Sequence, residues 1–349
     1  MKKYCNLIYI VILLTLNLSC IKQQANKKER NNTELLCTST TDTLKFSSGI
    51  GVIFQDSKGN YWFGIQNGGI SKYDGKTFQY FTINEGLLDN QIRSIQEDKN
   101  GNILIATAKG LSIYDGQKFI NYSTNINNPK YEWNETEGDL WFYAGEEEGI
   151  NRFDGINMNY LIFPKPKNQI PSGYGVTDIS KDKDGKVWIA TYAALFNYDG
   201  KMVNIFGHEN LNDELLHIRS VLADSKGRIW IGNNGIGVLL MKGNSIINFS
   251  EKHNLIHPTS TRRGDKSQPG TMEHVFAIEE DSEGNIWFGD RDTGAWKYDG
   301  TTMTNYTIDK NLKSQMVWTI YKDNTNRLLF GMANGGVYTF NGKSFDKTF

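Results

Sequence analysis

Short apolar segments and glycine-containing turns alternate along the chain from about residue 44 to residue 349. In each repeat an acidic residue is followed six positions later by tryptophan or leucine, and three positions later by glycine in every repeat but the last, as in Asp182, Gly185 and Trp188. The acidic residues are 42, 37, 47, 42, 57 and 42 positions apart. A period of about 40 residues is typical of propeller blades, each of which contains four short strands. The seven acidic positions are Asp56, Asp98, Glu135, Asp182, Asp224, Asp281 and Asp323.

The pattern inside one repeat predicts four antiparallel strands. A first strand has apolar residues at two fixed places, such as Val275 and Ile278, and ends at the acidic residue. The turn that follows favours Asp at its first position, where the carboxylate binds nearby backbone N–H groups, and Gly at its last. A tryptophan strand, a glycine-rich bend and a third strand that ends in Tyr-Asp-Gly come next, for example at 298–300. Asp-Gly predicts a two-residue hairpin that leads into the fourth strand.

Seven such repeats predict an all-β fold, a seven-bladed β-propeller of four-stranded antiparallel blades over residues 44–349. One four-stranded sheet exposes two apolar faces, and stacking the sheets in a closed ring buries them. We therefore expect the repeated tryptophans to be core residues between blades rather than ligand contacts. We also expect one terminal strand, either Lys343–Phe349 or Thr43–Phe46, to pair across the seam between the first and last blades.

The first 43 residues have a different composition. Lys2 and Lys3 precede an apolar stretch of about ten residues, which is too short to span a bilayer as a helix and predicts a signal peptide over residues 1–19. The residues before Cys20 resemble a bacterial lipobox, which implies cleavage and lipidation at Cys20, although Asn17 stands where an apolar residue is usual. The alternative is an ordinary secretory signal with an incidental cysteine. Residues 20–43 are mostly polar and predict a flexible tether behind the lipidated cysteine.

Composition narrows the class of partner and cofactor. The formal net charge is −1, so no basic surface for nucleic acid is indicated. If Cys5 is removed with the signal and Cys20 carries lipid, Cys37 has no partner for an intrachain disulfide, and the fold is held by packing. His253 and His257 have the spacing of metal ligands on a helix, but a proline follows and no third ligand is evident. We predict neither a metal nor a cofactor.

Candidate ligand-binding residues come from the loops at one end of the predicted ring. Loops on a rigid scaffold often carry function, and a propeller mouth is formed by the bends within blades and the connections between them. Arg93, Arg219, Phe276 and Trp318 occupy one equivalent position near the start of the first strand. Guanidinium groups, aromatic faces and carboxylates suit a sugar or a peptide. The alternative is that solvated loops simply collect polar residues. The predicted ligand-binding residues are Arg93, Glu146, Glu147, Tyr174, Arg219, His274, Arg291 and Trp318.

The repeat resembles the two-component regulator propeller repeat, in which Asp-x-x-Gly-x-apolar-Trp-apolar-Gly is followed by Gly-apolar and Tyr-Asp-Gly. The resemblance covers about residues 44–349, with Glu135 in place of aspartate in the third repeat and no tryptophan in the second and seventh. It implies a sensor propeller, because such repeats commonly form the periplasmic part of hybrid histidine kinases, where ligands are often oligosaccharides. This chain shows one propeller and no kinase or spanning segment, which favours a propeller that stands alone on its lipid.

These observations favour a non-enzymatic ligand-binding or sensing lipoprotein of the bacterial envelope. We expect it to be exported, lipid-anchored to the outer membrane on the periplasmic face, and to recognise a glycan, a peptide or an envelope protein at the propeller mouth. A metal-assisted lyase or hydrolase is the alternative, because streptogramin lyases are similar propellers that use His and Glu near the mouth. His217, Glu273 and His274 lie near first strands but match no motif of that family. A structural adaptor that docks another envelope protein is a third reading.

Overall fold

A computed structural model of the protein describes residues 40–45, 48–133, 138–145, 147–164, 173–211, 216–243, 245–261 and 265–349. They belong to one compact unit, which spans residues 37–349. The predicted signal peptide, Cys20 and most of the predicted tether lie outside these described residues. Within them, no helix has the length and apolarity needed to cross a bilayer.

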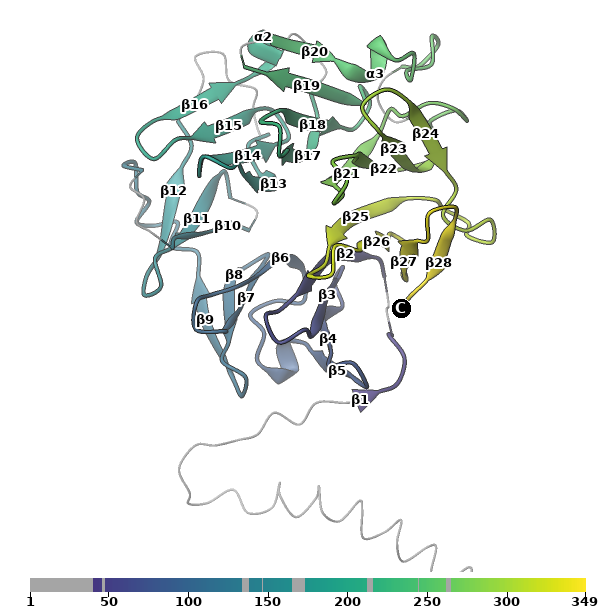
Figure 1. The fold of residues 1–349 in the computed structure, drawn as a ribbon. Coiled ribbons are helices and arrows are strands. Elements are labelled where there is room, and N and C mark those ends of the chain that lie inside the picture. The colour runs from purple at the N-terminus through teal and green to yellow at the C-terminus, as the bar shows by residue number, and fades with distance from the viewer. Residues whose placement is uncertain are drawn as a thin grey trace, which may run out of the picture. The chain divides into compact units, whose positions relative to one another are not determined.

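Seven antiparallel sheets surround a common axis and form the predicted seven-bladed β-propeller (Figure 1). The strands of the first three blades are β2 (Ile50–Gln55), β3 (Tyr61–Ile65), β4 (Gly69–Tyr73), β5 (Phe78–Phe81); β6 (Ile92–Glu97), β7 (Ile103–Thr107), β8 (Gly110–Tyr114), β9 (Phe119–Ser123); and β10 (Leu140–Tyr143), β11 (Gly149–Phe153), β12 (Met158–Ile162). Those of the last four are β13 (Val176–Lys181), β14 (Val187–Thr191), β15 (Leu195–Tyr198), β16 (Val203–Phe206); β17 (Ile218–Ala223), β18 (Ile229–Asn233), β19 (Val238–Lys242), β20 (Ser245–Asn248); β21 (Val275–Glu280), β22 (Ile286–Asp290), β23 (Gly294–Tyr298), β24 (Met303–Tyr306); and β25 (Val317–Lys322), β26 (Leu328–Met332), β27 (Val337–Phe340), β28 (Phe345–Lys347). Short helices, η1 (Ile83–Glu85), α2 (His208–Leu211) and α3 (Phe249–Lys252), lie in connections between blades.

The acidic residue of the repeat has two roles. In the fifth blade, one carboxylate oxygen of Asp224 accepts the backbone N–H groups of Lys226 and Arg228 at 3.0 and 2.8 Å, which closes the turn. The other oxygen accepts the indole N–H of Trp230 at 2.9 Å. The first, fourth and sixth blades repeat this indole bond at 2.9, 3.1 and 2.9 Å. The six-residue spacing therefore lets one charged side chain cap a turn and satisfy a buried indole donor.

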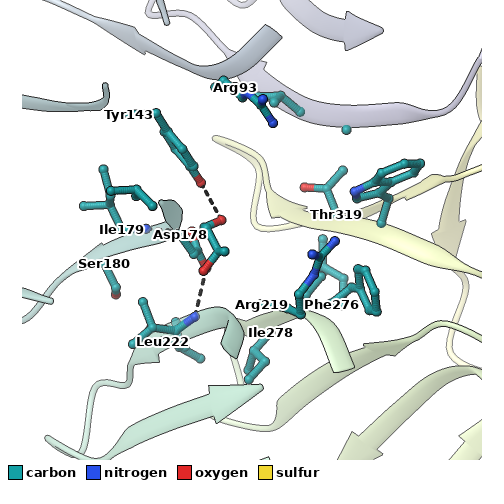
Figure 2. A pocket seen from close by; sticks show the side chains of 18 of the residues that line it. Arg93, Tyr143, Asp178, Ile179, Ser180, Arg219, Leu222, Phe276, Ile278 and Thr319 are labelled. Carbon is teal, nitrogen blue, oxygen red and sulfur yellow. Dashed lines mark hydrogen bonds between the residues drawn. The ribbon is translucent and has the colours of Figure 1, made fainter. Parts of the chain in front are cut away.

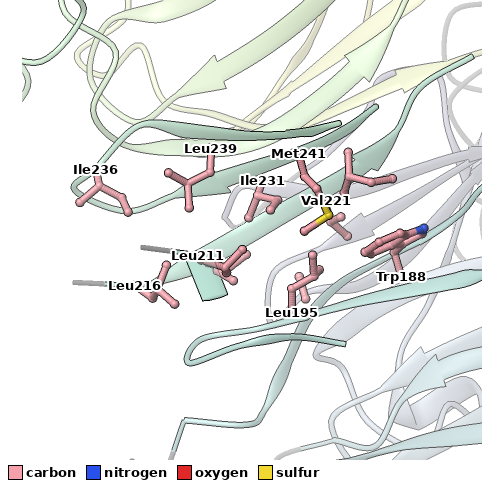
Figure 3. Close-up of a cluster of buried hydrophobic side chains, with 12 residues drawn as sticks. Trp188, Leu195, Leu211, Leu216, Val221, Ile231, Ile236, Leu239 and Met241 are labelled. Carbon is pink, nitrogen blue, oxygen red and sulfur yellow. The ribbon is translucent and has the colours of Figure 1, made fainter. Parts of the chain in front are cut away.

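The repeated tryptophans lie between blades, which confirms the prediction that they are core residues. All five are at most 8% exposed. Figure 3 shows Trp188 of the fourth blade in one cluster with Val221 and Ile231 of the fifth. In the first, fifth and sixth blades a glycine two positions after the tryptophan allows the next blade to pack closely. A Cβ at Gly289 would lie 2.7 Å from a methyl carbon of Val317 in the next blade.

The third blade departs from the four-stranded prediction. Its described residues form three strands and no innermost strand. The segment that should supply the inner strand runs along the outer edge, where Lys130 exchanges two backbone hydrogen bonds with β12 and Trp133 stacks on Trp141 at 5.9 Å. Residues 124–128 are almost entirely polar, and Pro129 has no N–H group for a sheet ladder. The 37-residue spacing of this repeat, the shortest in the chain, reflects the missing strand.

In the part of the chain that the structure describes, no strand is shared between the first and last blades, so the expectation of a terminal strand across the seam is wrong. β28 pairs with β27 inside the seventh blade, because an Asn-Gly hairpin connects them, and β1 (Thr40–Thr41) pairs with β5 of the first blade. Side chains hold the seam instead. The ring of Phe349 lies 5.0 Å from that of Phe63 and 5.3 Å from that of Tyr73, and the Tyr61 hydroxyl donates to Asp323 at 2.7 Å.

Candidate functional site

A β-bulge occurs at the same place in six inner strands. In β17 the register with β18 shifts between Ile218 and Ser220, so that Arg219 has no residue opposite it. The same shift occurs in β2, β6, β13, β21 and β25. Bulges redirect side chains and are common next to functional sites. The bulged residues, each five positions before the motif aspartate, are Gly51, Arg93, Thr177, Arg219, Phe276 and Trp318.

All six bulged residues line a depression of about 460 Å³ at the centre of the ring. Tyr143 of β10 takes the place of the missing inner strand of the third blade, and its hydroxyl donates to the carbonyl oxygen of Thr177 at 2.8 Å (Figure 2). Tyr192, from the bend between β14 and β15, and the amides of Gln66 and Gln91 complete the polar wall. This volume lies in the range of small-ligand sites.

Two guanidinium groups in the central depression have no carboxylate partner among the described residues. The guanidinium carbon of Arg219 lies 4.3 Å from the ring centroid of Phe276 and 5.5 Å from that of Tyr192, where ring faces stabilise a cation. Arg93 donates to the side-chain oxygen of Gln91 at 2.8 Å, and its buried Nε has no hydrogen-bond partner. The other four arginines in the described part of the chain are all ion-paired. Those pairs are Arg152–Asp139, Arg228–Asp224, Arg291–Asp292 and Arg327–Asp323.

Two carboxyl groups also line the depression. The oxygens of Asp178 accept the backbone N–H groups of Val221 and Ile179 at 2.9 and 2.8 Å. Burial raises the pKa of Asp178 to about 7. Burial also raises the pKa of Glu279 to about 7, although Lys322 partly opposes this. Both carboxyls are therefore partly protonated at neutral pH, and the two arginines dominate the charge of the depression.

Four segments of the chain match the two-component regulator propeller family, at residues 86–109, 170–193, 215–235 and 271–292. Each segment contains a bulged residue, the motif aspartate and the position of the tryptophan six residues later. Four repeats of this chain are therefore two-component regulator propeller repeats. Among curated proteins, no match to it was found.

Solved structures share the fold of this chain at low sequence identity. An extracellular domain described as part of a hybrid two-component system of B. thetaiotaomicron has a TM-score of 0.64 and 21% identity, over 86% of this chain and 40% of that domain. Another from the same organism, described as part of a one-component system, has a TM-score of 0.61 and 20% identity, over 87% of this chain and 40% of that one. Virginiamycin B lyase from Staphylococcus aureus has a TM-score of 0.64 and 14% identity, over 86% of this chain and 98% of the lyase. The chain thus spans 40% of the B. thetaiotaomicron domains, and what these structures share with it is the fold.

The predicted ligand-binding residues are only partly brought together in this propeller. Arg93, Arg219 and Trp318 all line the central depression, each at a bulge. Glu147 is exposed and lines a separate hollow near the rim with Lys109. Glu146 lies outside the described residues.

Tyr174 is placed in the core rather than in the mouth. Its side chain is 6% exposed and lies 6.1 Å from the ring of Phe196, in the cluster between the third and fourth blades. The histidines weighed as metal ligands have other contacts, since His253 packs on Phe249 at 4.2 Å and His257 bonds to Thr259. Within the described residues, no group of three or more His, Cys, Asp or Glu side chains is placed to hold a metal.

His274 and Arg291 anchor the long connection between the fifth and sixth blades. The two ring nitrogens of His274 lie 2.8 Å from the backbone oxygen of Asp265 and 2.8 Å from the side-chain oxygen of Asn234. Arg291 donates to the same backbone oxygen and pairs with Asp292 at 2.9 Å. Burial lowers the pKa of His274. These contacts use the polar atoms of both side chains for structure, and neither residue lines the central depression.

Sequence reasoning missed several polar residues of the depression, among them the amides of Gln66 and Gln91. Tyr143 is uncovered only because the third blade has no inner strand, and Tyr192 is an aromatic residue in a bend. Asp178 stands at an inner-strand position where the other blades have Val, Ser, Ala or Thr. Glu279, three positions after the bulge, is likewise an acidic residue on an inner strand. For these two residues the sequence did hold a signal, because each is a charged residue at a strand position that is neutral in the other blades.

Proposed function

We propose that this protein is a non-enzymatic recognition propeller that binds its ligand in the central depression. The observation that carries the proposal is the alignment of six bulges, which collects Arg93, Arg219 and Trp318 around one cavity. Forked donors, amides and ring faces on a rigid scaffold suit a glycan, a peptide or a projecting segment of an envelope protein. The formal net charge of −1 gives no basic excess that would favour nucleic acid.

The same proposal places the protein in the bacterial envelope. A signal peptide would export it, and a lipid on Cys20 would hold it on the periplasmic face of the outer membrane. The support is the sequence that leads to Cys20 and the fold shared with an extracellular domain of a B. thetaiotaomicron two-component system.

An enzymatic function of the lyase type has less support. Virginiamycin B lyase shares the fold over 98% of its length, and a histidine variant of that lyase is catalytically inactive. None of the five histidines of this chain lines the central depression. His217 packs beside Tyr192, with 5.0 Å between the ring centroids, and His274 is bound to Asp265 and Asn234. These positions support recognition rather than metal-assisted chemistry.

A substitution at Gly51 tests the proposed site. A Cβ at Gly51 meets no atom within 4 Å, so Gly51→Trp places a large ring in the depression without displacing the backbone. We expect members of an oligosaccharide and peptide panel to raise the Tm of the wild type but not that of Gly51→Trp. Gly207→Trp, at an equally open position outside the depression, is the matched control and should keep the shift. A panel that shifts neither protein, or a shift that survives Gly51→Trp, would contradict the proposal.

A further inference from the structure

The two unpaired guanidinium groups of the central depression favour an anionic ligand. A partly buried guanidinium without an acidic partner is costly, and every described arginine outside the depression has such a partner. Among the described residues, neither Asp178 nor Glu279, the carboxyls of the depression, forms an ion pair with Arg93 or Arg219. The Asp178 oxygens accept the N–H groups of Val221 and Ile179, and a Glu279 oxygen accepts a backbone N–H group. The Arg219 side chain is fixed by two aromatic rings, so its N–H fork is held in place for a ligand carboxylate.

The inner strands have few unpaired main-chain groups with which an extended peptide could form hydrogen bonds. Adding a strand to a sheet requires unpaired N–H and C=O groups along its edge. Here side chains from the preceding blade bind such groups. The Ser180 hydroxyl accepts the N–H of Ala223 at 3.0 Å, and the Tyr321 hydroxyl accepts an N–H of β2 at 2.9 Å. Even β10, which has no strand on its inner side, is capped by Gln96, whose amide donates to the carbonyl of Trp141 at 2.8 Å.

The groups that remain available are side chains that match a sugar acid. Trp318 is half-buried, and among the described residues its indole has no aromatic or cationic group on its face. An indole face packs against the apolar C–H face of a sugar ring. The amides of Gln66 and Gln91 can bind hydroxyl groups, and Arg93 and Arg219 supply forks for a carboxylate.

We infer that the ligand of the central depression is a carboxylate-bearing saccharide of the uronate type, held by Arg93 and Arg219 with one sugar ring on Trp318. This inference rests on the proposed function, because it names the ligand class of that same site. It adds a requirement that the proposed function does not contain, namely a negative charge on the ligand.

Calorimetric titration of the full chain tests this requirement with three probes. They are digalacturonate, its neutral dimethyl ester and the peptide triglutamate. We expect digalacturonate to bind, and the ester and the peptide to bind at least about tenfold more weakly, because they lack either the charge or the sugar ring. Arg219→Gln and Arg93→Gln should each raise the Kd of digalacturonate by about tenfold or more. Thermal melts of both variants check that the fold is retained.

Arg228→Gln is the matched control. It removes the same charge, but Arg228 is paired with Asp224 at the motif turn and does not line the depression. It should leave the Kd of digalacturonate within about threefold of the wild-type value. If Arg228→Gln weakened digalacturonate binding as much as the other two variants, the effect would be explained by net charge alone, and the inference would be overturned.

The remaining outcomes separate the inference from the proposed function. Equal binding of acid and ester, both abolished by Gly51→Trp, would overturn the anionic ligand while the depression stays the site. Preferential binding of triglutamate would replace the saccharide with a peptide. Absence of digalacturonate binding to the wild type would refute the inference, and the Gly51→Trp panel would then decide on the site independently.

Discussion

The two ends of each inner strand differ in what they keep constant. At the motif end, four blades repeat one carboxylate–indole hydrogen bond at 2.9 to 3.1 Å. At the other end, six bulges share one backbone arrangement but hold Gly, Arg, Thr, Arg, Phe and Trp. Packing between blades requires the first set to be uniform and makes no such demand on the second. The comparison teaches that, within this one chain, uniform positions form the scaffold and the varied ring lines the proposed site.

Exchanging one tryptophan at each end gives the largest expected contrast. Trp230 is fully buried and bonded to Asp224, so Trp230→Ala should lower the free energy of unfolding by about 3–5 kcal/mol. Trp318 is half-buried in the depression, so Trp318→Ala should cost less than about 1 kcal/mol and weaken ligand binding instead. Denaturant titrations of both variants measure this. Equal losses of stability would break the distinction between the two ends.

The seam should depend on one aromatic ring. Phe349 contacts Phe63 and Tyr73 of the first blade, where no strand is shared, so Phe349→Ala should cost about 2–3 kcal/mol in a urea titration. Tyr131→Ala, at a side chain that is 75% exposed, is the control and should change stability by less than about 0.5 kcal/mol. A Phe349→Ala variant as stable as this control would show that the seam is held in another way.

The irregular third blade offers a finer test of the carboxylate–indole bond. The indole N–H of Trp287 donates to Asp281, whereas that of Trp141 has no hydrogen-bond partner within the described residues. Both variants, Trp287→Phe and Trp141→Phe, lose similar ring volume, but only the first removes a hydrogen-bond donor from a partly buried carboxylate. Trp287→Phe should therefore be more destabilising by about 1–2 kcal/mol, measured by chemical denaturation. If both variants lost the same free energy of unfolding, the carboxylate–indole hydrogen bond would not explain why the repeat keeps its aspartate and tryptophan.

A pH series examines the acidic wall of the depression. The pKa of Asp178 is raised to about 7, so the folded state holds a proton between about pH 4 and 7 that the unfolded chain has lost. Its contribution to stability is complete below that range and is lost as the pH rises through 7. Between pH 5 and 8 the wild type should lose about 2–3 kcal/mol more than Asp178→Asn, with Glu279 still titrating in both. Parallel urea midpoints across this range would contradict the assigned protonation.

The sequence predicted the repeated parts of the molecule well because equivalent positions in each blade pack in the same way. Core positions such as Val275, Ile278 and Trp287 could be read from one blade and transferred to the others. The single events could not be predicted in this way. The missing strand of the third blade and the role of Phe349 at the seam each occur once, so no second copy supports them.

The candidate site was predictable only where it follows the repeat. Arg93, Arg219 and Trp318 share an equivalent position, and the structure places them around one cavity. Tyr174 was chosen from an insertion and His274 from the start of a first strand. Contacts of the folded loops decide whether these side chains are buried, and no pattern in the sequence predicts those contacts.

A crystal structure of the protein grown with digalacturonate tests the central claim most directly. The account predicts ligand density in the ring of bulged residues, with carboxylate oxygens within about 3.5 Å of the guanidinium groups of Arg93 or Arg219. Density confined to another place, such as the groove between the fourth and fifth blades that Trp188 and Met241 line, with nothing bound at the centre, would contradict it.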